Sequence, residues 1–148
     1  MRIASCALAR GGIVAYPTEG VYGLGCLPTE VAAIARLLAI KRRSWRKGLP
    51  LIAASIAELA PFVELPADGL RAEIEASWPG PVTWVLPARP GVPVLLTGGR
   101  RTLAVRVTGH PLAAALCKQA RSALVSTSAN RSGRPPLLTP LAVRRALG

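Results

Sequence analysis

The sequence predicts an α/β fold, with a twisted mixed sheet flanked by helices in a single domain over residues 1–148. Short apolar runs rich in β-branched residues alternate with longer segments whose apolar residues recur three and four positions apart. Hydrophobic residues make up 51% of the chain, which favours a buried core over disorder. The apolar stretches are far shorter than the roughly 20 residues of a membrane-spanning helix, so we expect no membrane span.

Glycine and capping residues delimit the expected elements of the first half of the chain. The glycine pair 11–12 is expected to end a first helix. Thr29 is expected to cap the second, and Ser55 with Glu58 to form a capping box for the third. The expected elements are, in order, a helix over 1–10, a strand over 13–16, a glycine-rich turn over 20–25, a helix over 31–40, a strand over 49–54, and helices over 55–59 and 67–77.

The second half of the chain continues the alternation of strands and helices. Pro111 stands at the first position of a helix, where proline is tolerated. The prolines of the segment 78–81 forbid regular structure there. We expect strands over 82–86, 103–107 and 123–126, and helices over 111–119 and 140–147.

The charge favours polyanionic partners. The chain has 19 Lys and Arg against seven Asp and Glu, a net charge of +12. Such a charge favours binding to nucleic acid, nucleotides or acidic membrane surfaces. A solvated basic surface without a dedicated partner is the alternative. The three cysteines, Cys6, Cys26 and Cys117, are odd in number and lack CxxC spacing. They are expected to be buried thiols of a protein in the reducing cytoplasm.

A basic cluster over residues 41–48 follows the expected second helix. If the chain is extended or looped beyond the helix, Lys41 and Arg43 point the same way and can bind one phosphate chain, with Lys47 nearby. Cations at the C-terminal end of a helix also complement its dipole, which is the alternative explanation. The cluster therefore indicates either an anion site or a helix end.

The glycine-rich segment 18–25 matches neither the dinucleotide fingerprint nor the phosphate-binding P-loop. Its glycines either bring the backbone close to a ligand or form a plain strand-to-helix turn. Local sequence does not separate these two explanations.

Polar residues at two other positions suggest ligand contacts. Arg106 lies in an apolar strand, so its charge must stand at the strand's end, on an edge, or facing an anion. Hydroxyl and amide side chains at Ser126, Ser128 and Asn130 directly follow a strand. Ligands gather at the carboxyl ends of strands in open α/β sheets. These groups therefore either bind phosphate or carboxylate oxygens or form turn hydrogen bonds.

Several chemistries find no support in the sequence. His110 is the single histidine and precedes a proline at a helix start, where a capping or surface role is expected. No Ser-His-Asp or Cys-His set can be assembled, and the acidic residues show no ligand spacing. We therefore assign no catalytic residue and predict no protein-held metal. Mg²⁺ is expected to arrive on a nucleotide, with phosphate and water as its main ligands.

The same motifs resemble the YrdC/Sua5/TsaC family of threonylcarbamoyl-AMP synthases. The similarity runs in order over about residues 12–140 and is closest to the short TsaC type. It rests on five segments: 16–25, 41–48, 78–83, 103–111 and 126–133. The resemblance implies a YrdC-like fold with a basic concave cavity. It also implies conversion of L-threonine, bicarbonate and ATP to L-threonylcarbamoyladenylate and pyrophosphate, for modification of position 37 of tRNA by other, downstream transfer proteins.

The resemblance also implies roles for individual residues. The ATP site would comprise Lys41, Arg43, Lys47, Thr102, Ser128 and Asn130. The threonine and carbamate site would comprise Thr18, Arg106 and Ser126. Family members usually continue beyond the last residue of this chain, so the resemblance is to a member without that C-terminal segment. No general base is identified.

Two other functions remain open at this point. A double-stranded RNA or tRNA binding module without catalysis would use the same cations, with an affinity that falls steeply with salt. A domain related to hydrogenase-maturation proteins is the second alternative. An RNA-binding module would ignore threonine, whereas a synthase would saturate with ATP and threonine.

Overall fold

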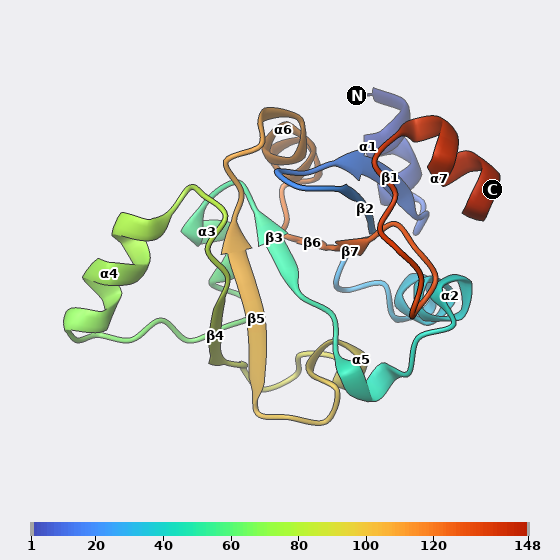
Figure 1. The fold of residues 1–148 in the computed structure, drawn as a ribbon. Coiled ribbons are helices and arrows are strands. Elements are labelled where there is room, and N and C mark those ends of the chain that lie inside the picture. Colours follow the sequence, from blue (N-terminus) through green and yellow to red (C-terminus); the bar gives the residue numbers. More distant parts are fainter. Residues whose placement is uncertain (1, 148) are drawn as a thin grey trace.

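The strands divide between two small sheets in the computed structural model, which describes residues 2–147 (Figure 1). The four-stranded sheet has the order β4-β5-β3-β6. Its strand β5 is parallel to β3, whereas β4 and β6 run antiparallel to their neighbours, so this sheet is mixed. It comprises β3 (Leu51–Ala53), β4 (Trp84–Pro87), β5 (Thr102–Val107) and β6 (Leu124–Val125).

The second sheet is antiparallel and has three strands, in the order β1-β2-β7. They are β1 (Val14–Pro17), β2 (Tyr22–Gly25) and β7 (Thr127–Ser128). Because β6 ends at Val125 and β7 begins at Thr127, Ser126 is the point where the chain passes from one sheet to the other. The expected mixed α/β architecture is confirmed, but the strands form two sheets rather than one.

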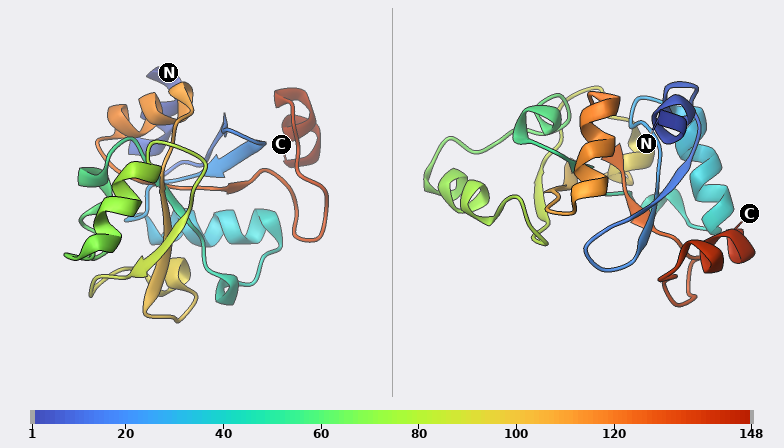
Figure 2. Two further views of the ribbon diagram at one scale, coloured as in Figure 1. Left: turned by 60° about the vertical axis from the view of Figure 1, so that its left-hand side comes forward. Right: turned by 90° about the horizontal axis from the view of Figure 1, so that it is seen from above.

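Helices flank the sheets (Figures 1 and 2). Helices α1 and α6 pack against each other and against β1, whereas α2 and α5 are in contact elsewhere in the molecule. Helix α4 extends away from the rest of the molecule (Figure 1). The helices are α1 (Arg2–Ala9), α2 (Val31–Lys41), α3 (Ile56–Leu59), α4 (Gly69–Ser77), α5 (Val94–Thr97), α6 (Pro111–Ala120) and α7 (Pro140–Leu147), with a 3-10 turn η1 (Trp45–Lys47).

Two apolar clusters form the core, and β3 contributes side chains to both. Leu51 and Ala53 belong to the larger cluster, which includes the buried face of α2. Ile52 points the other way, into a smaller cluster with Leu8 of α1 and Leu116 of α6. This alternation follows from the two-residue period of a strand. Burying the side chain of Leu51 or Ile52 contributes about 1.5–3 kcal/mol each, so β3 packs against helices on both sides.

The expected glycine-rich turn over 20–25 is wrong, because residues 22–25 form β2, paired with β1. Its glycines serve close packing between strands. A Cβ atom on Gly25 would lie 2.2 Å from the main-chain oxygen of Val125. The four-residue helix α5 was not expected from the sequence.

Two expected helix caps also differ from the structure. Glu30, not Thr29, is the N-cap of α2, and it makes no side-chain cap hydrogen bond. Ser55 does precede α3 without a side-chain cap bond, while Glu58 accepts a hydrogen bond from the main-chain nitrogen of Ala54 at 2.7 Å. Because Ala54 precedes the N-cap Ser55, neither hydrogen bond of the expected capping box is formed, and Glu58 instead fixes the residue before the cap.

The three cysteines differ in their exposure. Cys26 and Cys117 are fully buried, as expected, and burial raises the pKa of each thiol to about 12. Cys6 is exposed on α1, which contradicts the expectation.

Among the helices between residues 2 and 147, none combines the length and apolar character that crossing a membrane requires.

Candidate functional site

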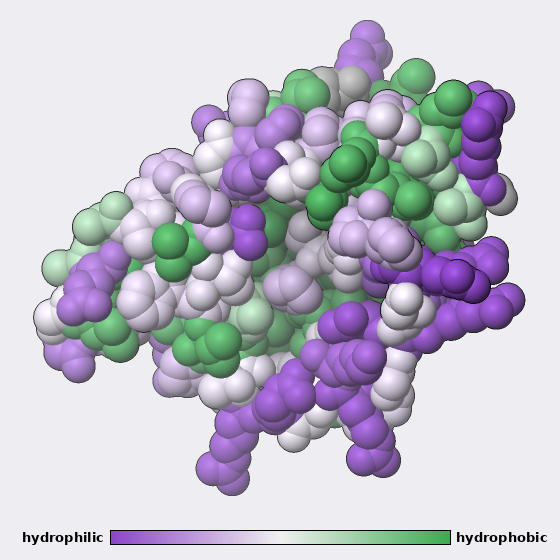
Figure 3. Space-filling view, viewed as in Figure 1, coloured by the Kyte–Doolittle hydropathy of each residue, from purple (hydrophilic) through white to green (hydrophobic). Residues whose placement is uncertain are grey.

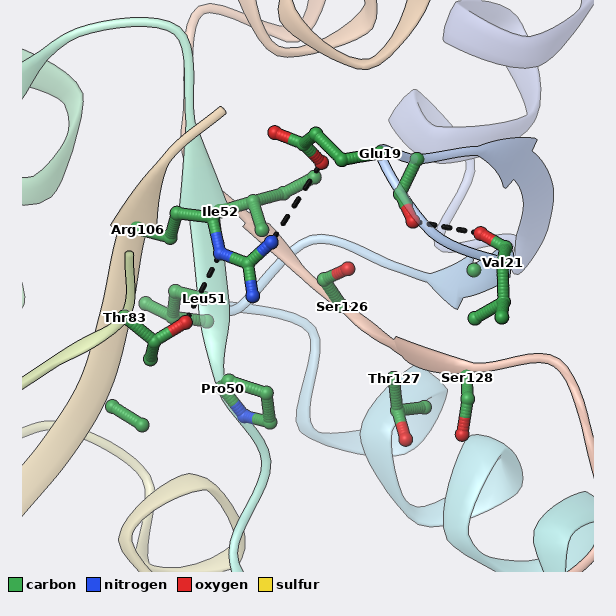
Figure 4. A pocket seen from close by; sticks show the side chains of 13 residues that line it. Glu19, Val21, Pro50, Leu51, Ile52, Thr83, Arg106, Ser126, Thr127 and Ser128 are labelled. Atoms are coloured by element: carbon green, nitrogen blue, oxygen red, sulfur yellow. Dashed lines mark hydrogen bonds and ion pairs between the residues drawn. The ribbon is translucent and has the colours of Figure 1, made fainter. Parts of the chain in front are cut away.

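A pocket of about 290 Å³ lies between the two sheets (Figure 4). One wall comes from the turn between β1 and β2 together with β7, and the other from β3 and β5. The crossing point Ser126 stands between them. The lining residues are Thr18, Glu19, Val21, Gly23, Pro50, Leu51, Ile52, Thr83, Ala104, Arg106, Ser126, Thr127 and Ser128. We call this the central pocket.

Arg106 is held on two sides at the central pocket (Figure 4). The alternation of β5 buries Val105 and Val107 in the core and leaves Arg106 half-buried at the pocket. Its Nε donates a hydrogen bond to Oγ1 of Thr83 at 3.0 Å, and its Nη1 lies 3.7 Å from Oε2 of Glu19. Since β5 lies between β4 and β3, the edge explanation fails, and the charge is paired and directed to the pocket.

Glu19 accepts hydrogen bonds from the opposite side of the pocket. Its Oε1 accepts from the hydroxyl of Thr108 at 2.7 Å and from the main-chain nitrogen of Gly109 at 2.9 Å. Desolvation, the largest effect, raises the pKa of Glu19, but these hydrogen bonds and the charge of Arg106 outweigh it. The net pKa lies below its usual value, so Glu19 is a carboxylate at neutral pH.

Apart from Thr83, the hydroxyl groups of the central pocket come from the turn after β1, from β7 and from the crossing point Ser126. Thr18 donates to the main-chain oxygen of Val21 at 2.7 Å, which fixes its side chain at the turn. Ser128 donates to Oδ1 of Asn130 at 2.5 Å. The structure thus brings Thr18, Arg106, Ser126 and Ser128 to one pocket, although up to 110 positions separate them in sequence.

A second pocket of about 140 Å³ adjoins the central one and shares Pro50 and Ala104 with it. We call it the basic pocket, because the described residues that line it include three cations and no acid. The full lining is Arg43, Lys47, Gly48, Leu49, Pro50, Val85, Leu96, Arg100, Thr102 and Ala104. Hydrophilic residues also gather at the lower right of the face shown in Figure 3, around α2 and α5.

Main-chain oxygens hold two of the three cations of the basic pocket, Arg43 and Arg100. Nη2 of Arg43 donates to the oxygen of Gly48 at 3.1 Å, while its Nε is buried without a hydrogen-bond partner among the described residues. Burial lowers the pKa of Arg43. Arg100 donates to the oxygens of Arg46 and Lys47 at 3.0 Å each, which anchors the turn η1.

Lys41 lies behind the pockets rather than in them. It is 2% exposed, and its Nζ donates to the main-chain oxygen of Ser128, to that of Asn130 at 2.7 Å, and to Oδ1 of Asn130 at 3.4 Å. Burial, with the charge of Arg43 adding to it, lowers the pKa of Lys41 to about 8. Lys41 is the last residue of α2, and Arg42 after it is left-handed. Lys41 and Arg43 therefore do not point the same way: Lys41 is buried, whereas Arg43 lines the basic pocket.

Sequence reasoning missed four residues of the site. Glu19 and Thr83 contact Arg106. Thr108 holds Glu19, and Arg100 lines the basic pocket and anchors η1. Glu19 and Thr83 stand in segments that the resemblance quoted, which was a usable signal, whereas Arg100 looked like loop charge. His110 precedes α6 without a side-chain cap bond. Within residues 2–147, no group of three potential metal ligands gathers.

The family model for Sua5, YciO and YrdC proteins, described as "Telomere recombination", matches residues 6–148. Threonylcarbamoyl-AMP synthase of Nitrosococcus oceani is 55% identical over 148 residues, which span 100% of this chain and 80% of that protein. The protein of the same name from Methylococcus capsulatus is 54% identical over 145 residues, 98% of this chain and 78% of that protein.

Among solved structures, that of P. abyssi Sua5 complexed with L-threonine superposes with a TM-score of 0.91 and 34% identity. The match covers 98% of this chain but 43% of the Sua5 chain, so the chain spans less than half the length of that protein. The motifs, the paired sheets and these matches agree: the chain belongs to the Sua5/YciO/YrdC family.

Proposed function

We propose that the chain is a threonylcarbamoyl-AMP synthase, which converts L-threonine, bicarbonate and ATP to L-threonylcarbamoyladenylate and pyrophosphate. Two relatives of that name match nearly the whole chain at 54–55% identity. The P. abyssi Sua5 structure with L-threonine supports the amino-acid substrate.

The observation that carries the proposal is that the central and basic pockets adjoin. One offers a half-buried arginine with hydroxyl groups, suited to an amino acid, and the other three cations, suited to a phosphate chain. The reaction must join a threonine carbamate to the α-phosphorus of ATP. Two adjoining sites of these kinds would place the reacting groups next to each other.

The threonine and carbamate end is assigned to Thr18, Arg106 and Ser126, with Arg106 pairing with the carboxylate. In the basic pocket, Arg43, Lys47 and Thr102 would hold the triphosphate. Ser128 lines the central pocket beside it, while Lys41 and Asn130 would support the ATP site from behind.

The chemistry needs positioning and charge neutralisation more than a protein nucleophile. The neutral threonine amine bonds to the carbon of bicarbonate, and water leaves, which gives the carbamate. A carbamate oxygen then attacks the α-phosphorus as the bond to pyrophosphate breaks. The cations of the basic pocket offset the charge that gathers on the leaving pyrophosphate.

The remaining expectations follow from this reaction. Mg²⁺ would enter with ATP and keep phosphate and water ligands. The adenylate would pass to downstream proteins that transfer the threonylcarbamoyl group to tRNA in the cytoplasm. Direct RNA binding by the exposed cations is compatible with this role.

A direct assay tests the proposal. The purified chain is incubated with ATP, Mg²⁺, bicarbonate and labelled L-threonine, and pyrophosphate and the adenylate are measured, with reactions lacking threonine or bicarbonate as controls. Pyrophosphate that depends on both supports the synthase. Absence of product together with absence of threonine binding would refute it, and salt-sensitive RNA binding would then favour the RNA-binding alternative.

A further inference from the structure

Glu19 links the two sheets across the central pocket (Figure 4). It belongs to the turn between β1 and β2, whereas its partners Thr108 and Gly109 directly follow β5 of the other sheet. Its second oxygen faces Arg106. A single carboxylate therefore joins the wall of one sheet to the arginine of the other.

Thr108 controls where this carboxylate lies. Its hydroxyl accepts a hydrogen bond from the main-chain nitrogen of His110 at 3.1 Å, and its single proton goes to Glu19. The main-chain nitrogen of Thr108 donates to Ala53 of β3 at 3.0 Å, which fixes the residue on the sheet. Thr108 is 2% exposed and is not among the described residues that line either pocket, so a ligand does not touch it.

Arg106 needs such support because its side chain is long. Thr83 holds Nε and Glu19 faces Nη1, while no hydrogen bond of Nη2 is formed among the described residues. Held on two sides, the guanidinium presents its remaining donors in one orientation. Fixing a rotamer-rich side chain before the ligand arrives improves affinity, because less freedom is lost on binding.

We propose that Thr108, acting through Glu19, positions Arg106 to receive the carboxylate of the amino-acid substrate. Glu19 and Thr108 are positioning residues, and the role of Arg106 rests on the proposed function. The alternative is that Glu19 and Thr108 merely stabilise the turn after β5. In that case the effect of Thr108→Val on threonine binding would not depend on whether Glu19 is present.

A double-mutant cycle separates these cases. L-threonine affinity is measured by calorimetry for the wild type, Thr108→Val, Glu19→Gln and the double variant, with ATP affinity measured alongside. We expect Thr108→Val to weaken threonine binding about tenfold in the wild type, which is roughly 1.4 kcal/mol. When Glu19 is already replaced by Gln, Thr108→Val should weaken threonine binding by less than about twofold. The ATP affinity should be the same in all four proteins.

Thr97→Val is the matched control. Thr97 is also a buried threonine, 6% exposed, with its own main-chain hydrogen bonds at the end of α5, and it has no contact with Arg106. It should leave threonine affinity unchanged. Equal losses from Thr108→Val with and without Glu19 would overturn the proposal.

A second measurement stands even if the chain does not bind threonine. The Nε–H signal of Arg106 is followed by ¹⁵N NMR in the unliganded protein and identified by its loss in Arg106→Lys. We expect Thr108→Val and Glu19→Gln to speed its exchange with water, and Thr97→Val to leave it unchanged. Unchanged exchange in the first two would refute the positioning role, whereas faster exchange without threonine binding would refute the proposed function alone.

Discussion

The ammonium group of Lys41 donates a hydrogen bond to the main-chain oxygen of Asn130 at 2.7 Å, across 89 positions of sequence. The same group donates to Ser128, and the main-chain nitrogen of Ser132 donates back to the oxygen of Lys41 at 2.8 Å. The C-terminal end of α2 is thereby joined to the segment that follows β7. A buried lysine paired with carbonyl oxygens, rather than with a carboxylate, fixes one wall of the site.

Lys41→Met is expected to destabilise the protein by about 1.5–3 kcal/mol, because hydrogen bonds from a charged group are lost and buried carbonyl oxygens are left without donors. Urea denaturation measures the change. Lys118→Met, on an exposed position of α6, should change stability by less than about 0.5 kcal/mol. Equal stability of the two variants would contradict the structural role of Lys41.

The stability contribution of Lys41 should depend on pH. Its pKa is about 8 in the folded protein and 10.5 when unperturbed, so between these values the unfolded chain binds more protons. Stability therefore rises with pH in this window, by at most about 1.4 kcal/mol per pH unit. A neutral amine can still donate to the carbonyls.

Urea denaturation of the wild type and of Lys41→Met between pH 7 and 10 measures this effect. We expect the wild type to gain stability relative to the variant above pH 8. Parallel stability curves would show that Lys41 titrates normally.

Lys47→Ala is expected to weaken ATP binding about five- to tenfold without changing the melting temperature, since the side chain is exposed and lines the basic pocket. The loss should shrink at high salt, as expected for a screened charge. Arg10→Ala removes a similarly exposed charge at the end of α1 and controls for net charge. If both variants lose ATP affinity equally, the basic pocket does not bind the nucleotide specifically.

Gly25→Ala is expected to cost about 1–3 kcal/mol, because its Cβ would lie 2.2 Å from the oxygen of Val125 and the two sheets would have to separate. Gly20→Ala is the matched control, since no atom lies within 4 Å of a Cβ added there. Thermal denaturation compares the two. A stable Gly25→Ala protein would mean that the contact between β2 and β6 is looser than described.

Alkylation of the native protein should modify Cys6 alone. Cys26 and Cys117 are fully buried, and their thiols, with pKa values of about 12, are protonated at neutral pH. Mass spectrometry after iodoacetamide treatment counts the modified thiols, and all three should react after denaturation. Rapid labelling of Cys26 or Cys117 in the native state would indicate local opening of the core.

The fold class followed from periodicity, because a strand or helix that buries one face must repeat its apolar residues at a fixed spacing. Helix α6 and strand β5 were placed well for this reason. Strand β2 was missed because its tyrosine and glycines carry no such pattern. Its conformation depends on pairing with β1 and on the close approach of Val125.

By itself the sequence determined the alternating elements and, through its ordered motifs, the family. The tertiary structure decided which cations reach a pocket. Lys41 and Arg43 are two positions apart, yet one is buried against Asn130 and the other lines the basic pocket. The partners of Arg106 were equally hidden in the sequence, since Glu19 and Thr83 approach it from distant segments. Long-range contacts of this kind depend on how the two sheets pack, which the local spacing of residues does not predict.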